Sequence, residues 1–126
     1  MTYKNLKILL IIEQCNPEWS SVTLVGYNYY KELSQLTDTT LVTHERNKSA
    51  LERVHPSADI IYIYESDLIQ KYYKFASRMS KFGNKTAWPL YITLIYPIYE
   101  AFNNLVYQRF KPDVEKGKYN IVHAIT

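Results

Sequence analysis

The sequence predicts an α/β fold in which helices cover both faces of an open parallel sheet. The first observation is a short apolar run at residues 6–12, followed by a polar turn and a periodic helix; this is typical of a buried parallel strand that leads into a crossover helix. The second is that strand-like and helix-like segments then alternate as far as residue 64. This arrangement is described as Rossmann-like.

The first helix is expected from Val22 to Leu36, because apolar residues recur there at helical spacing and Ser20 or Ser21 can cap it. Further along the chain we expect a strand at 39–44, a helix at 45–54, a strand at 59–64, a helix at 66–82 capped by Ser66 and ended by Gly83, one kinked helix or two at 87–110, a polar loop at 111–118 and a strand at 119–125. The segment at 87–110 is interrupted by prolines and is too short in its apolar part to span a membrane.

Composition indicates a globular domain. The 126 residues are 47% hydrophobic and 21% charged and contain only three glycines, which excludes disordered and fibrous classes. The sequence stops directly after the last expected strand, where such a domain normally adds another helix. We therefore expect residues 1–126 to form a single domain that is a fragment of a two-domain protein.

Cysteine content and the N-terminus predict a cytoplasmic location. Cys15 is the only cysteine, so an internal disulfide and a cysteine metal cluster are excluded, as in a reducing compartment. The apolar run at 6–12 is short, and Glu13 follows it without a cleavage motif, so we predict no signal peptide.

Charge is distributed unevenly. The net charge of +3 is too small to indicate nucleic-acid binding, and we predict none. Between Leu68 and Tyr99, however, no acidic residue occurs, and the basic residues are Lys71, Lys74, Arg78, Lys81 and Lys85. Helical spacing places the first four of these on one face, opposite an apolar stripe. That face either contacts an anionic membrane surface, which predicts a peripheral location at the inner side of a membrane, or is only solvated.

Motifs for cofactors are missing. The sequence has no G-x-G-x-x-G after the first strand and no P-loop, so a dinucleotide or nucleoside triphosphate site lacks its usual phosphate cradle. Its histidines, His44, His55 and His123, show no metal-ligand spacing. We predict neither a cofactor nor a metal.

Substrates of such sheets bind beyond the carboxyl ends of the strands, so the expected binding residues lie after the first two strands. These candidates are Ser20, Gly26, His44, Glu45 and Arg46. Gly26 either admits a ligand to the helix N-terminus or lets the helix approach the strand. The His44 cluster either binds a hydroxylated substrate or is a solvated helix start.

Two further side chains lie near the same edge. Cys15 follows the first strand, where a nucleophile would sit, but nothing near it in sequence lowers its pKa, and we interpret it as a structural thiol. His123 is placed near the carboxyl end of the last strand, where it is either a packed side chain or the catalytic residue.

The run KILLIIEQCNPEWSSVTLVGYNYYKELSQLTDTTLVTH resembles the opening of the family 4 glycosyltransferases. YNIVHAIT resembles their fourth strand, which commonly reads D-V-V-H-x-H. The specific matches are Gly26, the strand at 41–43 and the segment at 121–123. The chain departs from the pattern at Val25, where a second Gly is common, and at Ile125, where a second His often ends the strand.

The resemblance implies the N-terminal, acceptor-side half of a GT-B architecture. It implies transfer with retention of configuration from a nucleotide-sugar donor, held mainly by a C-terminal domain, to an acceptor that the sequence does not identify. It also favours His123 as the catalytic candidate. The main rival hypothesis is a non-catalytic α/β binding module that uses a basic surface rich in tyrosine, of which the chain has thirteen. A nucleotide-binding or receiver-like domain is disfavoured by the missing glycine motif and acidic cluster.

Overall fold

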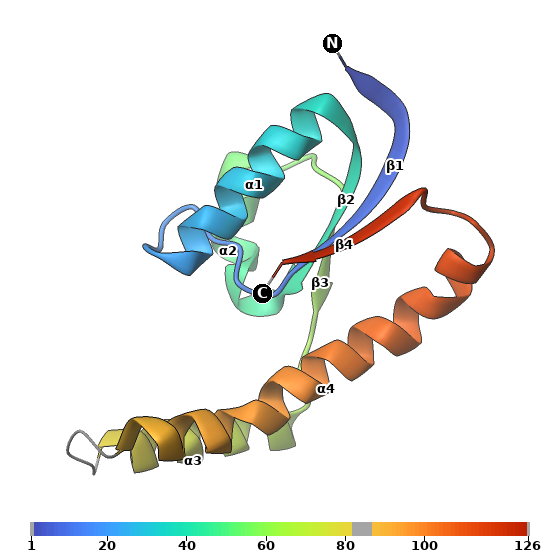
Figure 1. The fold of residues 1–126 in the computed structure, drawn as a ribbon. Helices are drawn as coiled ribbons and strands as arrows, with labels where there is room; N and C mark the ends of the chain where they lie inside the picture. Colours follow the sequence, from blue (N-terminus) through green and yellow to red (C-terminus); the bar gives the residue numbers. More distant parts are fainter. Residues whose placement is uncertain (1, 82–86, 126) are drawn as a thin grey trace. The chain divides into compact units, whose positions relative to one another are not determined.

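The computed structural model describes residues 2–81 and 87–125. The elements are β1 (Tyr3–Ile12), α1 (Val22–Leu36), β2 (Thr37–His44), a 3-10 turn η1 (Glu45–Asn47), α2 (Lys48–Val54), β3 (Ile60–Ile63), α3 (Asp67–Lys81), α4 (Ala87–Glu115) and β4 (Ile121–Ile125) (Figure 1). The chain forms two compact units, which are described separately. The sheet unit is Met1–Tyr64 with Gln108–Thr126, and the helical unit is Glu65–Tyr107.

The sheet unit contains one four-stranded sheet in the order β3-β2-β1-β4. Each neighbouring pair is parallel, and Leu10 of β1 lies in register with Leu41 of β2 and with His123 of β4. The predicted fold class, an α/β protein with an open parallel sheet and flanking helices, is therefore confirmed. The strands all point the same way, so their carboxyl ends form one edge and their amino ends the other, here called the carboxyl edge and the amino edge.

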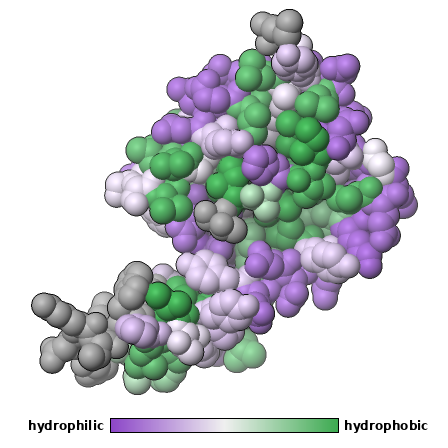
Figure 2. All heavy atoms as spheres, viewed as in Figure 1, coloured by the Kyte–Doolittle hydropathy of each residue, from purple (hydrophilic) through white to green (hydrophobic). Residues whose placement is uncertain are grey.

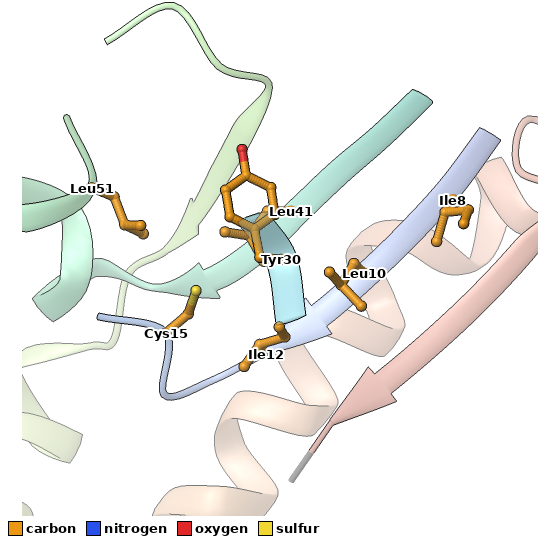
Figure 3. Packing of buried hydrophobic residues seen from close by; sticks show 7 residues of the cluster. All are labelled: Ile8, Leu10, Ile12, Cys15, Tyr30, Leu41 and Leu51. Carbon is orange, nitrogen blue, oxygen red and sulfur yellow. The ribbon is translucent and has the colours of Figure 1, made fainter. Parts of the chain in front are cut away.

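Both faces of β1 are buried, which explains its nearly continuous apolar sequence. Ile8, Leu10 and Ile12 alternate onto one face, where they pack in a cluster with residues of α1 and α2 (Figure 3). The cluster also contains Cys15, Tyr30, Leu41 and Leu51. Leu9 points to the opposite face and is fully buried as well. Burial of one such side chain stabilises the fold by roughly 1.5–3 kcal/mol, so β1 is the centre of the core.

Several element boundaries differ from the sequence prediction. β1 begins at Tyr3 because Tyr3 pairs with Thr37, which also starts β2 earlier than expected. The segment at 87–110 belongs to one helix, α4, which continues through Pro97.

The predicted polar loop at 111–118 is wrong for its first half, because α4 runs to Glu115. The helix ends where Gly117 adopts a φ of 76°, a conformation that glycine allows at little cost. The amide of Gly117 donates to the carbonyl of Val114 at 3.0 Å, and that of Lys118 to Asp113 at 3.0 Å. These bonds form a Schellman motif, so Gly117, and not Pro112, terminates the helix.

The helical unit contains α3 and most of α4. Ser66 caps α3 as predicted: its Oγ accepts from the amide of Ile69 at 3.4 Å and its carbonyl from the amide of Gln70 at 3.1 Å. The predicted end at Gly83 lies outside the described residues. The apolar stripe of α3 is not buried along its whole length: Ala76 is buried, whereas Leu68, Phe75 and Met79 are exposed. Among the described residues, no helix carries an apolar stretch of the length needed to cross a bilayer.

Candidate functional site at the carboxyl edge

Two segments of the chain meet at the carboxyl edge of the sheet unit. Residues 13–21 leave β1 and are called the first edge loop, and residues 44–47 leave β2 and are called the second edge segment. The main-chain carbonyl of Glu13 joins them: it accepts from the Asn47 side-chain amide at 2.8 Å and from the Thr43 hydroxyl at 3.2 Å. The backbone amide of His44 donates to the same oxygen at 3.4 Å. A single carbonyl thereby fixes the positions of both segments.

Two buried asparagines extend this connection. Asn47 is fully buried and also donates to the Thr43 hydroxyl at 2.9 Å. Its side-chain oxygen accepts from the amide group of Asn16 at 3.4 Å, and the side-chain oxygen of Asn16 accepts from the backbone of Glu18 at 2.9 Å. Buried polar groups with complete hydrogen bonds hold a unique geometry, so the loop is pre-organised. Sequence reasoning missed both residues, although an Asn in the turn after each of two strands is a usable signal.

An ion pair adds charge to the edge. The guanidinium of Arg46 donates to Oε1 of Glu13 at 2.7 Å, and both side chains are partly exposed, at 28% and 15%. Arg46, predicted as a binding residue, therefore stands beside the first edge loop, and Glu45 is half-buried next to it. The pair presents both a donor and an acceptor group at the surface of the edge.

His44 is held inside the edge. Its side chain is buried, and Nδ1 accepts from the backbone amide of Arg46 at 3.1 Å, which leaves the ring proton on Nε2. Burial, and secondarily the charge of Arg46, lowers the pKa of His44 to about 4. The imidazole is neutral at pH 7, and its N–H group is at Nε2.

Cys15 packs in the core as a thiol. It is fully buried, and burial raises its pKa to about 12, so it carries no thiolate at neutral pH. This agrees with the structural role inferred from the sequence and disfavours nucleophilic catalysis at the edge.

The outer part of the first edge loop is exposed. Glu18, Trp19 and Ser20 all reach solvent, and Trp19 is 46% exposed. Glu18 receives two hydrogen bonds from Arg53 of α2, at 2.8 and 2.5 Å, which tie the loop to the second helix. The Ser20 carbonyl accepts from the Thr23 hydroxyl at 2.8 Å. Trp19 was not singled out in the sequence analysis, yet an exposed aromatic ring on a fixed loop is a typical ligand platform.

Gly26 is a packing position. It is buried on α1, and a Cβ at this residue would lie 2.6 Å from the carbonyl oxygen of Gln14 and 2.9 Å from Cγ2 of Ile12. Of the two interpretations left open by the sequence, this geometry supports close approach of the helix to the first strand.

His123 lies two residues before the carboxyl end of β4, which begins at Ile121 instead of Tyr119. Its ring packs edge-on against Tyr29 of α1, with ring centroids 5.4 Å apart, and it is half-buried. Its catalytic role stays a prediction.

The predicted membrane-surface residues belong to the helical unit. Lys71, Lys74 and Arg78 are exposed on α3, whereas the side chain of Lys81 and all of Lys85 lie outside what the structure describes. Within the described part of the chain, no three His, Cys, Asp or Glu side chains cluster closely enough to hold a metal ion.

Comparison with models of protein families, with curated proteins and with solved structures gives no match to this chain.

Proposed function

We propose that this chain is the acceptor-binding half of a cytoplasmic glycosyltransferase that uses a nucleotide-sugar donor. The observation that carries the proposal is the joining of two loops through the Glu13 carbonyl at the carboxyl edge of a parallel sheet. This edge is where ligands of open α/β sheets bind. The resemblance of residues 7–44 and 119–126 to the family 4 glycosyltransferases favours a sugar-transferring enzyme among the activities found on this fold.

The chemistry of the edge suits a neutral hydroxylated acceptor. Arg46 and Glu13 offer a donor and an acceptor, which together match a hydroxyl group that both gives and receives hydrogen bonds. The exposed indole of Trp19 offers an apolar surface against which the C–H face of a sugar ring can pack. In this proposal His44 is a positioning residue, since its buried ring fixes the backbone at Arg46.

Mapping of amide chemical shifts tests this assignment. We expect titration of the chain with a panel of methyl glycosides to shift amides of residues 13–21 and 44–47 in a saturable way. We expect calorimetry with UDP-, GDP- and ADP-sugars to detect negligible binding, because the donor is assigned to another domain. Saturable glycoside shifts confined to other parts of the chain, or micromolar nucleotide-sugar binding, would contradict the proposal.

A second function, contact with an anionic membrane surface, is favoured by the arrangement of side chains on α3. At 100° per residue, the exposed apolar residues Leu68, Phe75 and Met79 form a row beside the basic face that carries Lys74 and Arg78. Exposed apolar side chains of the helical unit are visible as green spheres in Figure 2. Apolar residues flanked by basic ones are typical of helices that lie in a membrane interface. This surface also supports the rival hypothesis of a binding module.

Vesicle sedimentation tests the membrane proposal with a charge-matched control. Changing Lys74 and Arg78 to Gln should weaken binding to anionic vesicles roughly thirty-fold, because each basic residue near such a surface is worth about 1 kcal/mol. Changing Lys31 and Lys116 to Gln removes the same charge outside α3 and should have little effect. Equal loss in both variants, or equal binding to neutral and anionic lipid, would show that the basic face is only solvated.

A further inference from the structure

A polar concavity lies at the amino edge of the sheet unit, remote from the carboxyl edge along the strands. It has a volume of about 380 Å³ and is lined by residues from the start of β1, the end of α1, the start of β2 and the connection before β3. These residues are Lys4, Tyr30, Ser34, Thr37, Asp38, Thr39, His55, Ala58 and Asp59. Neither the proposed acceptor site nor the membrane surface uses any of them.

Tyr30 is the central observation. Its side chain is only 2% exposed, and the ring packs in the core cluster while its hydroxyl points away from Ile12 and Cys15 (Figure 3). Among the described residues, the Tyr30 hydroxyl is not one of the fully buried side-chain atoms that lack a hydrogen-bond partner, and Tyr30 lines the concavity. Burial raises the pKa of Tyr30 to about 12, so the group stays protonated and can donate. A nearly buried phenol that lines a concavity is positioned for a ligand.

The rest of the lining is already oriented by internal bonds. The ammonium of Lys4 donates to the carbonyls of Ser34 at 2.8 Å and Thr37 at 3.2 Å. Oδ2 of Asp59 accepts from the Thr40 hydroxyl at 2.6 Å. His55 is fixed by its Nε2, which lies 3.1 Å from the hydroxyl of Tyr27, and by edge-on packing against the Tyr30 ring. These contacts define where each group points before any ligand arrives.

Charge narrows the ligand class. Asp38 and Asp59 supply two carboxylates against one ammonium from Lys4, so phosphate and other anions are repelled. The ammonium in turn disfavours a small cation. Hydrogen-bond donors and acceptors lie side by side in this lining. They match a molecule with several hydroxyl groups, because each hydroxyl can both donate and accept a hydrogen bond. We propose that this concavity binds a small neutral polyhydroxylated ligand, a monosaccharide or polyol, with the Tyr30 hydroxyl as a donor.

Glucose and glycerol are suitable probes, with inorganic phosphate and methylamine as charged comparators, in amide-shift titrations of the whole chain. We expect saturable shifts of Lys4, Thr39 and Asp59 with the neutral probes alone. Tyr30→Phe removes one hydrogen bond and keeps the ring, so binding should weaken roughly three- to ten-fold. Tyr29→Phe, on the same helix but outside the concavity, should bind as the native chain does.

Asp38→Asn provides a second variant, because Asp38 is exposed and its change leaves the core intact. It should also weaken binding while leaving the unfolding transition unchanged. The proposal is overturned if neither neutral probe gives saturable shifts at the amino edge, if Tyr30→Phe and Asp38→Asn bind as tightly as the native chain, or if only a charged comparator binds. None of these outcomes affects the carboxyl-edge assignment, which depends on shifts at residues 13–21 and 44–47.

Discussion

The two edges of the same parallel sheet use their polar side chains in different ways. At the carboxyl edge the polar side chains are buried and form hydrogen bonds with one another and with the Glu13 carbonyl. These side chains are Asn16, Thr43 and Asn47. At the amino edge, the polar groups around Tyr30 surround an open concavity. The positions of the loops at the carboxyl edge therefore depend on interior hydrogen bonds, and substitutions of these side chains should lower the stability of the fold. Substitutions of the polar side chains that line the amino-edge concavity should mainly change ligand binding.

The largest expected effect is a pH dependence that originates at His44. The unfolded imidazole binds a proton near pH 6.5, but the buried one resists protonation until about pH 4. The unfolded state therefore holds more protons between these values, and stability falls as pH is lowered through this window, by up to about 3 kcal/mol. Urea unfolding of the native chain and of His44→Gln from pH 7 to pH 4 checks this. Parallel curves for the two proteins would contradict it.

The next effect concerns the bonds that join the two loops. Asn47→Ala removes donors to Glu13 and Thr43 and leaves the Asn16 amide without its acceptor, which should lower the free energy of unfolding by about 2 to 3 kcal/mol. Asn28→Ala, at an exposed position of α1, should change it by less than about 0.5 kcal/mol. Equal losses in urea titrations would mean that the carboxyl edge is no more tightly bonded than the surface.

A steric test follows from α1. Gly26→Ala would place a Cβ against the Gln14 carbonyl and should cost about 2 kcal/mol, because neither the helix nor the loop backbone can move away freely. Gly117→Ala has open space around it and should cost only about 1 kcal/mol, from its positive φ. Thermal unfolding of both variants measures the difference. A smaller loss at Gly26 than at Gly117 would show that the helix is not in contact with the loop.

The smallest effect is a stabilisation. Ser21 precedes α1 with a φ of 63° and a ψ of −133°, a conformation that glycine favours. Ser21→Gly should raise the free energy of unfolding by about 1 kcal/mol, while Ser20→Gly, at a residue whose φ is negative, should lower it slightly. If both changes destabilise equally, the first edge loop carries no backbone strain.

Patterns in the sequence predicted the fold because its local signals agree with one another. The apolar run at the first strand, the periodicity of α1 and the β-branched residues of β2 all require the same parallel sheet. Element ends were harder to predict, since the start of β1 depends on pairing with Thr37 and the end of α4 on the Schellman motif at Gly117.

The sequence indicates where the candidate site lies on the sheet but not the contacts that hold it. His44 ends a strand and Arg46 follows it, so that rule selects both as candidates, whereas Asn16 and Asn47 act through hydrogen bonds between residues distant in sequence. His123 shows the same limit, because its ring packs against Tyr29, a residue distant in sequence. Tertiary contacts decide these features, and one sequence contains no direct measure of them.

The most direct test of the central claim, that the carboxyl edge binds a hydroxylated acceptor, is the affinity of the tightest methyl glycoside for Trp19→Ala. The account predicts affinity roughly five- to ten-fold below that of the native chain, since an aromatic platform contributes about 1 kcal/mol beyond its buried area. Tyr73→Ala removes an exposed aromatic ring from α3 and should leave the affinity unchanged. Unchanged affinity in Trp19→Ala, or an equal loss in Tyr73→Ala, would contradict the claim.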